Sequence, residues 1–213
     1  MHIALIGATG FVGTALLNEL LQRGHRVTAL ARDPAKLPLR EGLTVVQANA
    51  TDAAQVAQAV RGVDAVASAY NPGWTHPDLH DEFLRGSRAI TAGVKAAGVQ
   101  RLLVVGGAGS LYVAPGVQLV DTPQFPAEWK NGALAAREAL NLLRQESTLQ
   151  WTFLSPAILL EPGERTGHYR LGTESPVMNG DQPGKISVAD LAVAIVDELE
   201  APRHLQQRFT VAY

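Results

Sequence analysis

Short apolar runs alternate with helical segments along almost the whole chain. The first run, His2–Ile6, leads into a glycine cluster and then a segment, 11–23, whose apolar positions recur every three to four residues, as in an amphipathic helix. Gly24 is a natural stop for that helix, and a second apolar run covers Arg26–Ala31. This pattern predicts a strand–turn–helix–strand unit at the start of the chain.

The same alternation continues to the end of the sequence. Further strands are expected at residues 44–47, 65–69, 101–105, 151–154 and 208–211. Further helices are expected at residues 53–60, 79–97, 132–145 and 187–199. Strands that alternate with helices predict an α/β fold: one Rossmann-type domain over residues 1–213, with a doubly wound, mostly parallel sheet and helices on both faces.

Three longer stretches interrupt this rhythm, at residues 70–80, 106–131 and 161–184. Each follows the predicted carboxyl end of a strand and is rich in proline and glycine. In doubly wound sheets the ligand crevice lies outside the carboxyl ends of the strands, and loops longer than about 12–15 residues are uncommon without a role. We expect these stretches to form the substrate side of a pocket; ordinary surface loops are the alternative.

Composition narrows the function further. The net charge is −2 and no basic tract is present, so neither nucleic acid nor an anionic membrane is an expected partner. The absence of cysteine excludes disulfides, thiolate catalysis and Cys-ligated metals. The sequence has no leader-like start and no run of about 18 apolar residues, so we expect a cytoplasmic protein without a membrane span.

The glycine cluster carries the sharpest chemical signal. Gly7, Gly10 and Gly13 have the spacing G-x-x-G-x-x-G, directly after a predicted strand and at the opening of a helix. Gly7 permits a tight turn, Gly10 lets the backbone approach a pyrophosphate, and Gly13 lets the helix pack closely on the strand. The helix N-terminus then offers N–H groups and a positive dipole to the phosphates. This arrangement predicts a dinucleotide-binding site.

The end of the second strand indicates which dinucleotide binds. An acidic residue there would hold the ribose 2′-hydroxyl of NAD, but this chain has Arg32, which suits the 2′-phosphate of NADP, with Thr9 as a second contact. We therefore expect NADP(H) to be preferred; NAD(H) also binds if Arg32 is simply solvated. Asp33 is expected to cap a short helix. Asp52 suits either an adenine contact or the cap of the helix that starts at residue 53.

With these motifs in place, the chain resembles the atypical short-chain dehydrogenases/reductases of the NmrA-like superfamily, and within them the NADH-flavin reductase subgroup related to biliverdin-IXβ/flavin reductase. The segments that carry the resemblance are residues 3–13, 27–36, 68–74, 101–111 and 151–163. The resemblance implies that the pyrophosphate is wrapped by Gly7, Thr9, Gly10, Phe11 and Val12.

The resemblance also implies roles at later strand ends. Ala69 and Tyr70 would line the ribose, and Arg32 would meet the 2′-phosphate. Ser110 falls where short-chain reductases often carry a catalytic serine. Segment 154–157, which includes Pro156, would hold the carboxamide end of the nicotinamide.

One departure from the family pattern changes the expected chemistry. No tyrosine in this chain has a lysine four residues later, and the corresponding region reads Glu-Trp-Lys-Asn at 128–131. Ordinary alcohol–ketone chemistry and epimerisation are therefore disfavoured. Hydride transfer to a flavin or quinone needs no strongly activated acid, because the acceptor is itself electrophilic. A redox sensor that binds NADP(H) without turnover is the alternative from another class, and an epimerase is a weaker one.

Other side chains in the three loops are candidates for the acceptor site. Lys130 and Arg137 would attract an anionic tail, with a plain helix-face charge as the alternative for Arg137. His168 would serve as a proton donor. His76 and His80 are four residues apart, but Pro77 lies between them, so no metal site is expected. Oligomeric state stays open, and a homo-oligomer is compatible with the sequence. The aromatic residues expected to wall the acceptor, or merely to anchor loops, are Tyr70, Trp74, Tyr112, Phe125 and Trp129.

Overall fold

The computed structural model describes residues 1–213 and is built around one eight-stranded sheet. The strand order is β10-β14-β8-β5-β4-β1-β2-β3, and every neighbouring pair is parallel except β10 with β14. The strands are β1 (His2–Ile6), β2 (Arg26–Ala31), β3 (Leu43–Gln47), β4 (Ala65–Ser68), β5 (Arg101–Val105), β8 (Gln150–Ser155), β10 (Arg170–Gly172) and β14 (Gln207–Ala212).

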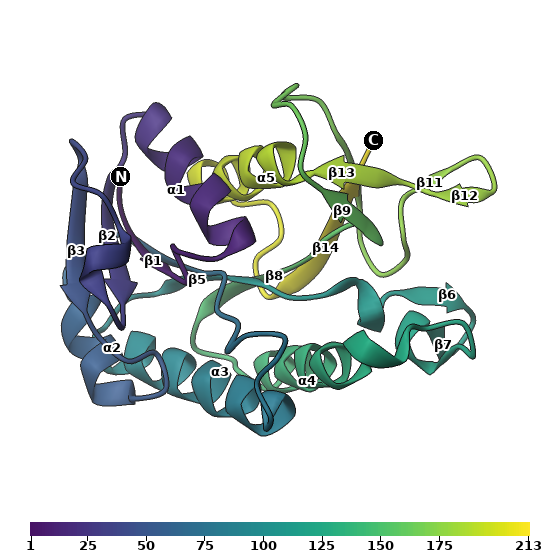
Figure 1. The fold of residues 1–213 in the computed structure, drawn as a ribbon, viewed down its shortest axis with the longest axis horizontal. Helices are drawn as coiled ribbons and strands as arrows, with labels where there is room; N and C mark the ends of the chain where they lie inside the picture. Colours follow the sequence, from purple (N-terminus) through teal and green to yellow (C-terminus); the bar gives the residue numbers. More distant parts are fainter.

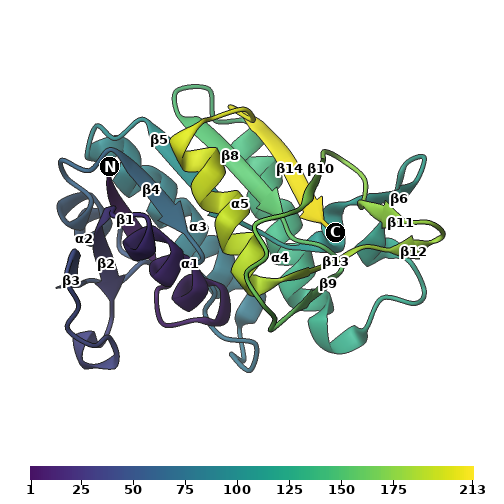
Figure 2. The same cartoon turned by 90° about the horizontal axis from the view of Figure 1, so that it is seen from above.

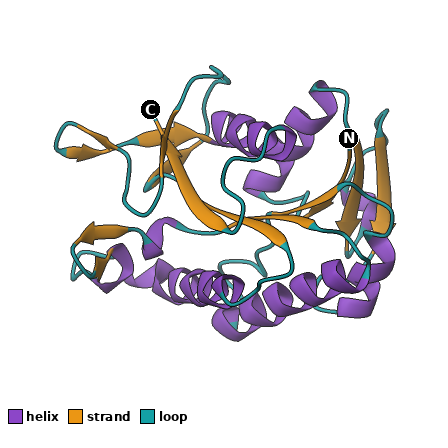
Figure 3. Cartoon of the chain, turned by 180° about the vertical axis from the view of Figure 1, so that it is seen from behind, coloured by secondary structure: helices purple, strands orange, loops and turns teal.

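Helices cover both faces of this sheet, which confirms the predicted Rossmann-type fold (Figure 1). On one face lie α1 and α5; on the other lie α2, α3 and α4 (Figures 1 and 3). The helices are α1 (Phe11–Gln22), α2 (Ala53–Ala59), α3 (Leu79–Ala96), α4 (Ala127–Arg144) and α5 (Val188–Glu200). None of them is both long enough and apolar enough to cross a bilayer.

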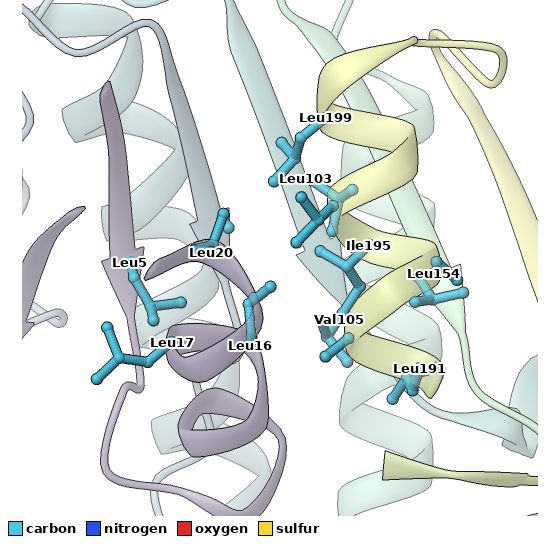
Figure 4. Close-up of a cluster of buried hydrophobic side chains, with 14 of the residues drawn as sticks. Leu5, Leu16, Leu17, Leu20, Leu103, Val105, Leu154, Leu191, Ile195 and Leu199 are labelled. Carbon is cyan, nitrogen blue, oxygen red and sulfur yellow. The ribbon is translucent and has the colours of Figure 1, made fainter. Parts of the chain in front are cut away.

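Alternate residues of each strand supply two separate cores. In β1, Ile3 and Leu5 belong to the 24-residue cluster under α1 and α5, whereas Ala4 and Ile6 belong to the 17-residue cluster under α2, α3 and α4. This division follows from the two-residue period of a strand. Figure 4 shows the first core, in which Leu103 of β5 and Ile195 of α5 lie close together. Burial on both faces explains why the strands read as continuous apolar runs.

The structure differs from the sequence prediction mainly in the long loops. The loop at 106–131 contains a hairpin of β6 (Tyr112–Ala114) and β7 (Val117–Gln118), and the first turns of α4. The loop at 161–184 contains β10 and a hairpin of β11 (Met178–Asn179) and β12 (Gln182–Pro183). A parallel pair, β9 (Leu159–Glu161) with β13 (Lys185–Ser187), joins its two ends. Strands of two or three residues are too short to show a period-2 pattern, so the prediction missed them.

The predicted start of α4 at residue 132 is wrong, because the helix begins at Ala127. Gly132 looked like a helix boundary, but it lies inside the helix and faces Trp74: a Cβ at this position would lie 2.6 Å from the indole ring. A glycine here makes room for the aromatic side chain of the 70–80 loop.

Candidate cofactor site

The glycine turn between β1 and α1 has the geometry that close backbone packing demands. Gly7 has φ +84°, and a Cβ there would lie 2.4 Å from the carbonyl oxygen of Ala69. A Cβ on Gly13 would lie 1.9 Å from the carbonyl oxygen of Gly7. Neither position accepts a side chain, because real Cβ contacts are never this short. The turn is therefore built as a cradle, and it fits the pyrophosphate of a dinucleotide.

The N-terminus of α1 opens this cradle toward solvent. Gly10 is the N-cap and supplies no side-chain cap, so no protein side chain satisfies the first N–H groups of the helix. Thr9, Gly10 and Phe11 are exposed around it, and Phe11 is 52% exposed. Val12 is half-buried. The N-terminus of the helix thus offers free N–H groups and the positive end of the helix dipole to an anion, as the sequence predicted.

Arg32 follows β2 at the same edge of the sheet and is exposed. Its guanidinium makes no ion pair or hydrogen bond within the chain, and Gln47 donates only to its backbone carbonyl, at 3.3 Å. The adjacent Asp33 accepts a hydrogen bond from the N–H of Ala35, which confirms it as the cap of a short helix rather than a ribose ligand. An unpaired arginine at this position suits a 2′-phosphate; that contact stays a prediction.

Asp52 is the N-cap of α2. Its carboxylate accepts hydrogen bonds from the N–H groups of Ala54 and Gln55, at 2.9 and 3.1 Å, and from the Gln55 side chain at 2.8 Å. These bonds, those from Gln55 above all, lower the pKa of Asp52. The capping role is confirmed, and a contact with adenine stays a prediction.

The segment after β4 meets the glycine turn through its backbone. Ala69 lies against Gly7, whereas the ring of Tyr70 points under α3, where a Cβ on Gly86 would lie 2.2 Å from it. The Tyr70 hydroxyl donates to the carbonyl oxygen of Glu82 at 3.2 Å, and burial raises its pKa to about 12. The Tyr70 side chain is therefore a packing anchor, and a ribose contact from this segment would come from its backbone.

Ser110, in the short turn after β5, is buried. Arg208 of β14 donates to its hydroxyl at 2.9 Å and to its carbonyl oxygen at 2.8 Å. The Arg208 side chain has no exposed surface, and its other terminal nitrogen pairs with Glu174. Arg208 could not be recognised from the sequence, because a lone arginine in a closing strand carries no pattern. The catalytic role of Ser110 stays a prediction.

Unpartnered polar atoms gather where β8 ends. Ser155 and Thr210 are register partners in the parallel β8–β14 pair. Their hydroxyls have no hydrogen-bond partner, and neither has Nε of Arg208. Buried polar atoms without partners are rare in proteins. Pro156, which follows directly, is also buried. These unpaired polar atoms thus lie buried next to the segment where the carboxamide is expected.

A groove of about 620 Å³ lies between the β6–β7 and β11–β12 hairpins. The two hairpins project side by side at one end of the molecule (Figures 1 and 2). The groove is lined mainly by apolar groups, including Tyr112, Ile158, Pro176 and Met178. Tyr112 belongs to the segment that follows β5, which ends at Val105, and Ile158 belongs to the segment that follows β8, which ends at Ser155. The groove is therefore lined by the loops that leave the carboxyl ends of these two strands.

The remaining loop candidates are spread more widely. Trp74 and Trp129 are 59% and 54% exposed, and Trp74 packs on α4 at Gly132. Phe125 is half-buried, and Lys130 is exposed. Neither tryptophan lines the hairpin groove, so their contribution to an acceptor site stays a prediction.

The charged and histidine candidates have ordinary surroundings. Arg137 pairs with Asp121 at 2.8 Å, and His168 is exposed. His76 accepts from the N–H of Asp78, and His80 contacts Asp81 at 3.0 Å. The structure brings no three His, Asp or Glu side chains together as ligands for a metal ion.

Asp190 is a further buried group whose importance the sequence did not reveal. It lies in α5, as predicted, with Ser187 as the helix cap. Its carboxylate also accepts hydrogen bonds from the N–H groups of Thr166 and Gly167 and from the Tyr213 hydroxyl, at 2.6–2.8 Å. It thereby fixes the 161–184 loop and the C-terminus onto α5.

Comparisons with known proteins agree with this geometry. A family described as NAD(P)H-binding matches residues 7–202. The uncharacterised protein YwnB of Bacillus subtilis (strain 168) is 41% identical over 216 residues, which cover 99% of this chain and 98% of YwnB. A proposed epimerase from Bacteroides thetaiotaomicron is 46% identical, with TM-score 0.93 and coverage of 100% of this chain and 96% of that one. A proposed NADH-flavin reductase from Streptococcus pneumoniae TIGR4 is 36% identical, with TM-score 0.87 and coverage of 100% and 99%. The chain therefore belongs to the NAD(P)H-binding family, within the atypical short-chain dehydrogenases/reductases.

Proposed function

We propose that this protein is an NADPH-dependent reductase that transfers hydride to a flat, electrophilic acceptor of the flavin or quinone type. The observation that carries the proposal is the position of the apolar hairpin groove, which is lined by the loops that follow β5 and β8. In doubly wound folds the reactive end of a dinucleotide lies near such strand ends. One similar structure, from Streptococcus pneumoniae, is a proposed NADH-flavin reductase.

The dinucleotide, when bound, supplies the hydride, and the residues of this chain bind and orient it. The glycine turn would hold the pyrophosphate, and Arg32 the 2′-phosphate. Tyr112, Pro176 and Met178 would hold a planar acceptor and exclude water from it. Because Arg208 donates to the Ser110 hydroxyl oxygen, the O–H of Ser110 is free to donate to the acceptor or to the carboxamide.

The first test is NADPH oxidation followed by absorbance, with FMN, FAD, riboflavin and a simple quinone as acceptors. We expect turnover with at least one of them. A charge-assisted hydrogen bond contributes about 1.5–3 kcal/mol, so Arg32→Ala should raise KM for NADPH about 10- to 100-fold and leave KM for NADH unchanged. Arg61→Ala, another exposed arginine far along the chain from the turn, is the matched control and should change neither value.

The alternative is a redox sensor that binds NADP(H) without turnover. The same experiment separates the two functions. Tight NADPH binding with no oxidation by any of the four acceptors would contradict the reductase and favour the sensor. Equal loss of NADPH and NADH binding in Arg32→Ala would contradict the contact with the 2′-phosphate.

A further inference from the structure

A second cavity lies on the face of the sheet that α3 and α4 cover. Its volume is about 310 Å³, and it shares no residue with the hairpin groove. Ser68 of β4 and Val104 of β5 form its floor, and apolar side chains of the two helices, including Phe83 and Leu143, form its walls. Val104 is only half-buried although β5 is a central strand. The helices therefore leave part of the sheet uncovered.

The cavity is long and narrow. Along α3 its lining runs from Phe83 to Lys95, twelve residues, which at 1.5 Å per residue is about 18 Å. One water molecule takes about 30 Å³ of liquid, and a methylene group is of similar size, so the cavity holds about ten such groups. These dimensions suit a single extended chain better than a fused ring system.

The polar rim of the cavity carries more positive than negative charge. Its lining includes Arg88, Lys95 and one carboxylate, Glu146. Lys95 pairs with Glu146 at 2.6 Å and lowers the pKa of that carboxyl to about 2, so this pair is formed and neutral overall at neutral pH. Arg88 is 60% exposed, and its one carboxylate neighbour, Glu138, lies 3.5 Å away. An exposed ion pair of this kind is weak, so Arg88 is free to bind an anion.

We propose that this cavity binds a single-chain amphiphile with an anionic head, of the medium-chain carboxylate class. The alkyl chain of this ligand would lie along Phe83 and Leu143, and its anionic head would contact Arg88 at the rim. Charge complementarity and the slot-like shape both favour this occupant.

The segment that forms part of the cavity floor also supports the glycine turn. Ser68 and Tyr70 line the cavity, and Ala69 between them contacts Gly7 from the other side. The Tyr70 ring is wedged against Gly86, so it cannot yield toward α3. An alkyl chain that presses on Tyr70 therefore acts on the backbone segment that supports the glycine turn. Binding at the two sites is expected to be coupled, and the coupling must be reciprocal.

Calorimetry with decanoate, below its micellar concentration, tests the site in the intact protein and does not depend on turnover. We expect one decanoate per chain, bound at least tenfold more tightly than decylamine, which has the same chain length but a cationic head. Arg88→Gln should weaken decanoate binding severalfold. Arg85→Gln, on the same helix and 63% exposed but outside the lining, should not.

A second matched pair of variants tests where the alkyl chain of the ligand binds. Ala92→Phe places a ring over the opening and should abolish binding, whereas Ala96→Phe, one turn later and outside the lining, should not. Equal decanoate binding by both variants, or equal affinity for decylamine, would overturn the proposal. So would a dimer in sedimentation that Ala92→Phe dissociates and to which decanoate does not bind, because a second copy would then cover this face.

The coupling has its own readout. Saturating decanoate should change the Kd for NADPH, measured by fluorescence titration, at least threefold in the wild-type protein and not in Ala92→Phe. Decanoate binding without any change in NADPH affinity would overturn the coupling through Tyr70 and leave the amphiphile site in place.

Discussion

The guanidinium of Arg208 donates to both the hydroxyl and the carbonyl oxygen of Ser110, at 2.9 and 2.8 Å. Burial lowers the pKa of Arg208, and Glu174 acts in the opposite direction. A guanidinium has no acceptor, so Arg208 occupies the Ser110 hydroxyl as an acceptor and directs the serine proton to another partner. The pair thus gives Ser110 a fixed orientation two residues before Tyr112, which lines the hairpin groove.

This orientation makes the proposed role of Ser110 testable. If its O–H stabilises charge on the acceptor, Ser110→Ala should lower kcat by about 100-fold or more while leaving the Kd for NADPH unchanged. The loss of one hydrogen bond should also lower the free energy of unfolding by about 1 kcal/mol. Steady-state kinetics and urea denaturation measure the two effects. Ser147→Ala, an exposed serine near the end of α4, is the control. An unchanged kcat in Ser110→Ala would leave the Arg208 contact as purely structural.

The glycine turn offers a prediction with an internal control. Gly7 and Gly62 have similar φ angles, +84° and +77°, but only Gly7 has a neighbour that a Cβ would strike, the carbonyl oxygen of Ala69. Gly62→Ala should therefore cost only the left-handed backbone penalty, about 1–2 kcal/mol. Gly7→Ala should cost more than this and weaken NADPH binding at least tenfold. Thermal unfolding and fluorescence titration of both variants would check this; equal effects would show that the contact with Ala69 does not matter.

The sequence was sufficient to predict the parallel strands of the sheet, its helices and the glycine turn, because each leaves a local pattern. The run at residues 102–105 is apolar throughout since β5 is covered on both faces, and the glycine spacing follows directly from backbone contacts at Gly7 and Gly13. Caps were also predictable: Asp33 and Ser187 occupy the positions that capping demands.

The parts that could not be predicted depend on contacts between residues distant in the sequence. Arg208 reaches Ser110 across 98 positions, and Asp190 holds residues 166 and 167 and the C-terminal Tyr213. Nothing in the local sequence distinguishes these residues from surface charges. The hairpins that form the groove were missed for a different reason, since strands of two or three residues carry no readable periodicity.

Asp190 leads to a prediction about pH. Burial alone would raise its pKa, but hydrogen bonds from Thr166, Tyr213 and Gly167 outweigh this, and the pKa is lowered below 3.8 in the folded protein. A carboxyl with a lowered pKa contributes stability that is present above the unfolded pKa and is lost as the pH falls through the folded value. Asp190→Asn weakens the buried hydrogen bonds to this side chain. It should therefore lower the free energy of unfolding by about 1–3 kcal/mol at pH 7, and by less below about pH 4.

Urea denaturation from about pH 7 down to about pH 2.5, which passes through the pKa of about 3.9 of an aspartate in the unfolded chain, measures this effect. Asp181→Asn, at the exposed tip of the β11–β12 hairpin, should change stability little at any pH. Amide hydrogen exchange at residues 166 and 167 should rise in Asp190→Asn. A stability loss that is the same at pH 3 and pH 7 would contradict the ionised state of this carboxylate.

The final prediction compares a buried ion pair with an exposed one. Arg101 of β5 and Glu198 of α5 pair at 3.1 Å with side chains 7% and 3% exposed, whereas Lys185 and Glu161 pair at 2.9 Å with side chains 60% and 52% exposed. Removal of one partner from a buried pair leaves an uncompensated charge, and burial already lowers the pKa of Arg101. Glu198→Gln should therefore lower the free energy of unfolding by about 3–5 kcal/mol, and Glu161→Gln by less than about 1 kcal/mol.

A double variant separates the charge from the packing. Replacement of both buried partners by apolar residues of similar size is often neutral, so Arg101→Met with Glu198→Met should recover much of the stability that Glu198→Gln loses. The recovery cannot be complete, because Glu198 also accepts hydrogen bonds from the N–H groups of Arg203 and His204, at 3.1 and 3.0 Å. If the double variant were less stable than Glu198→Gln, those backbone contacts, rather than the charge of Arg101, would be the main reason for a carboxylate at this position.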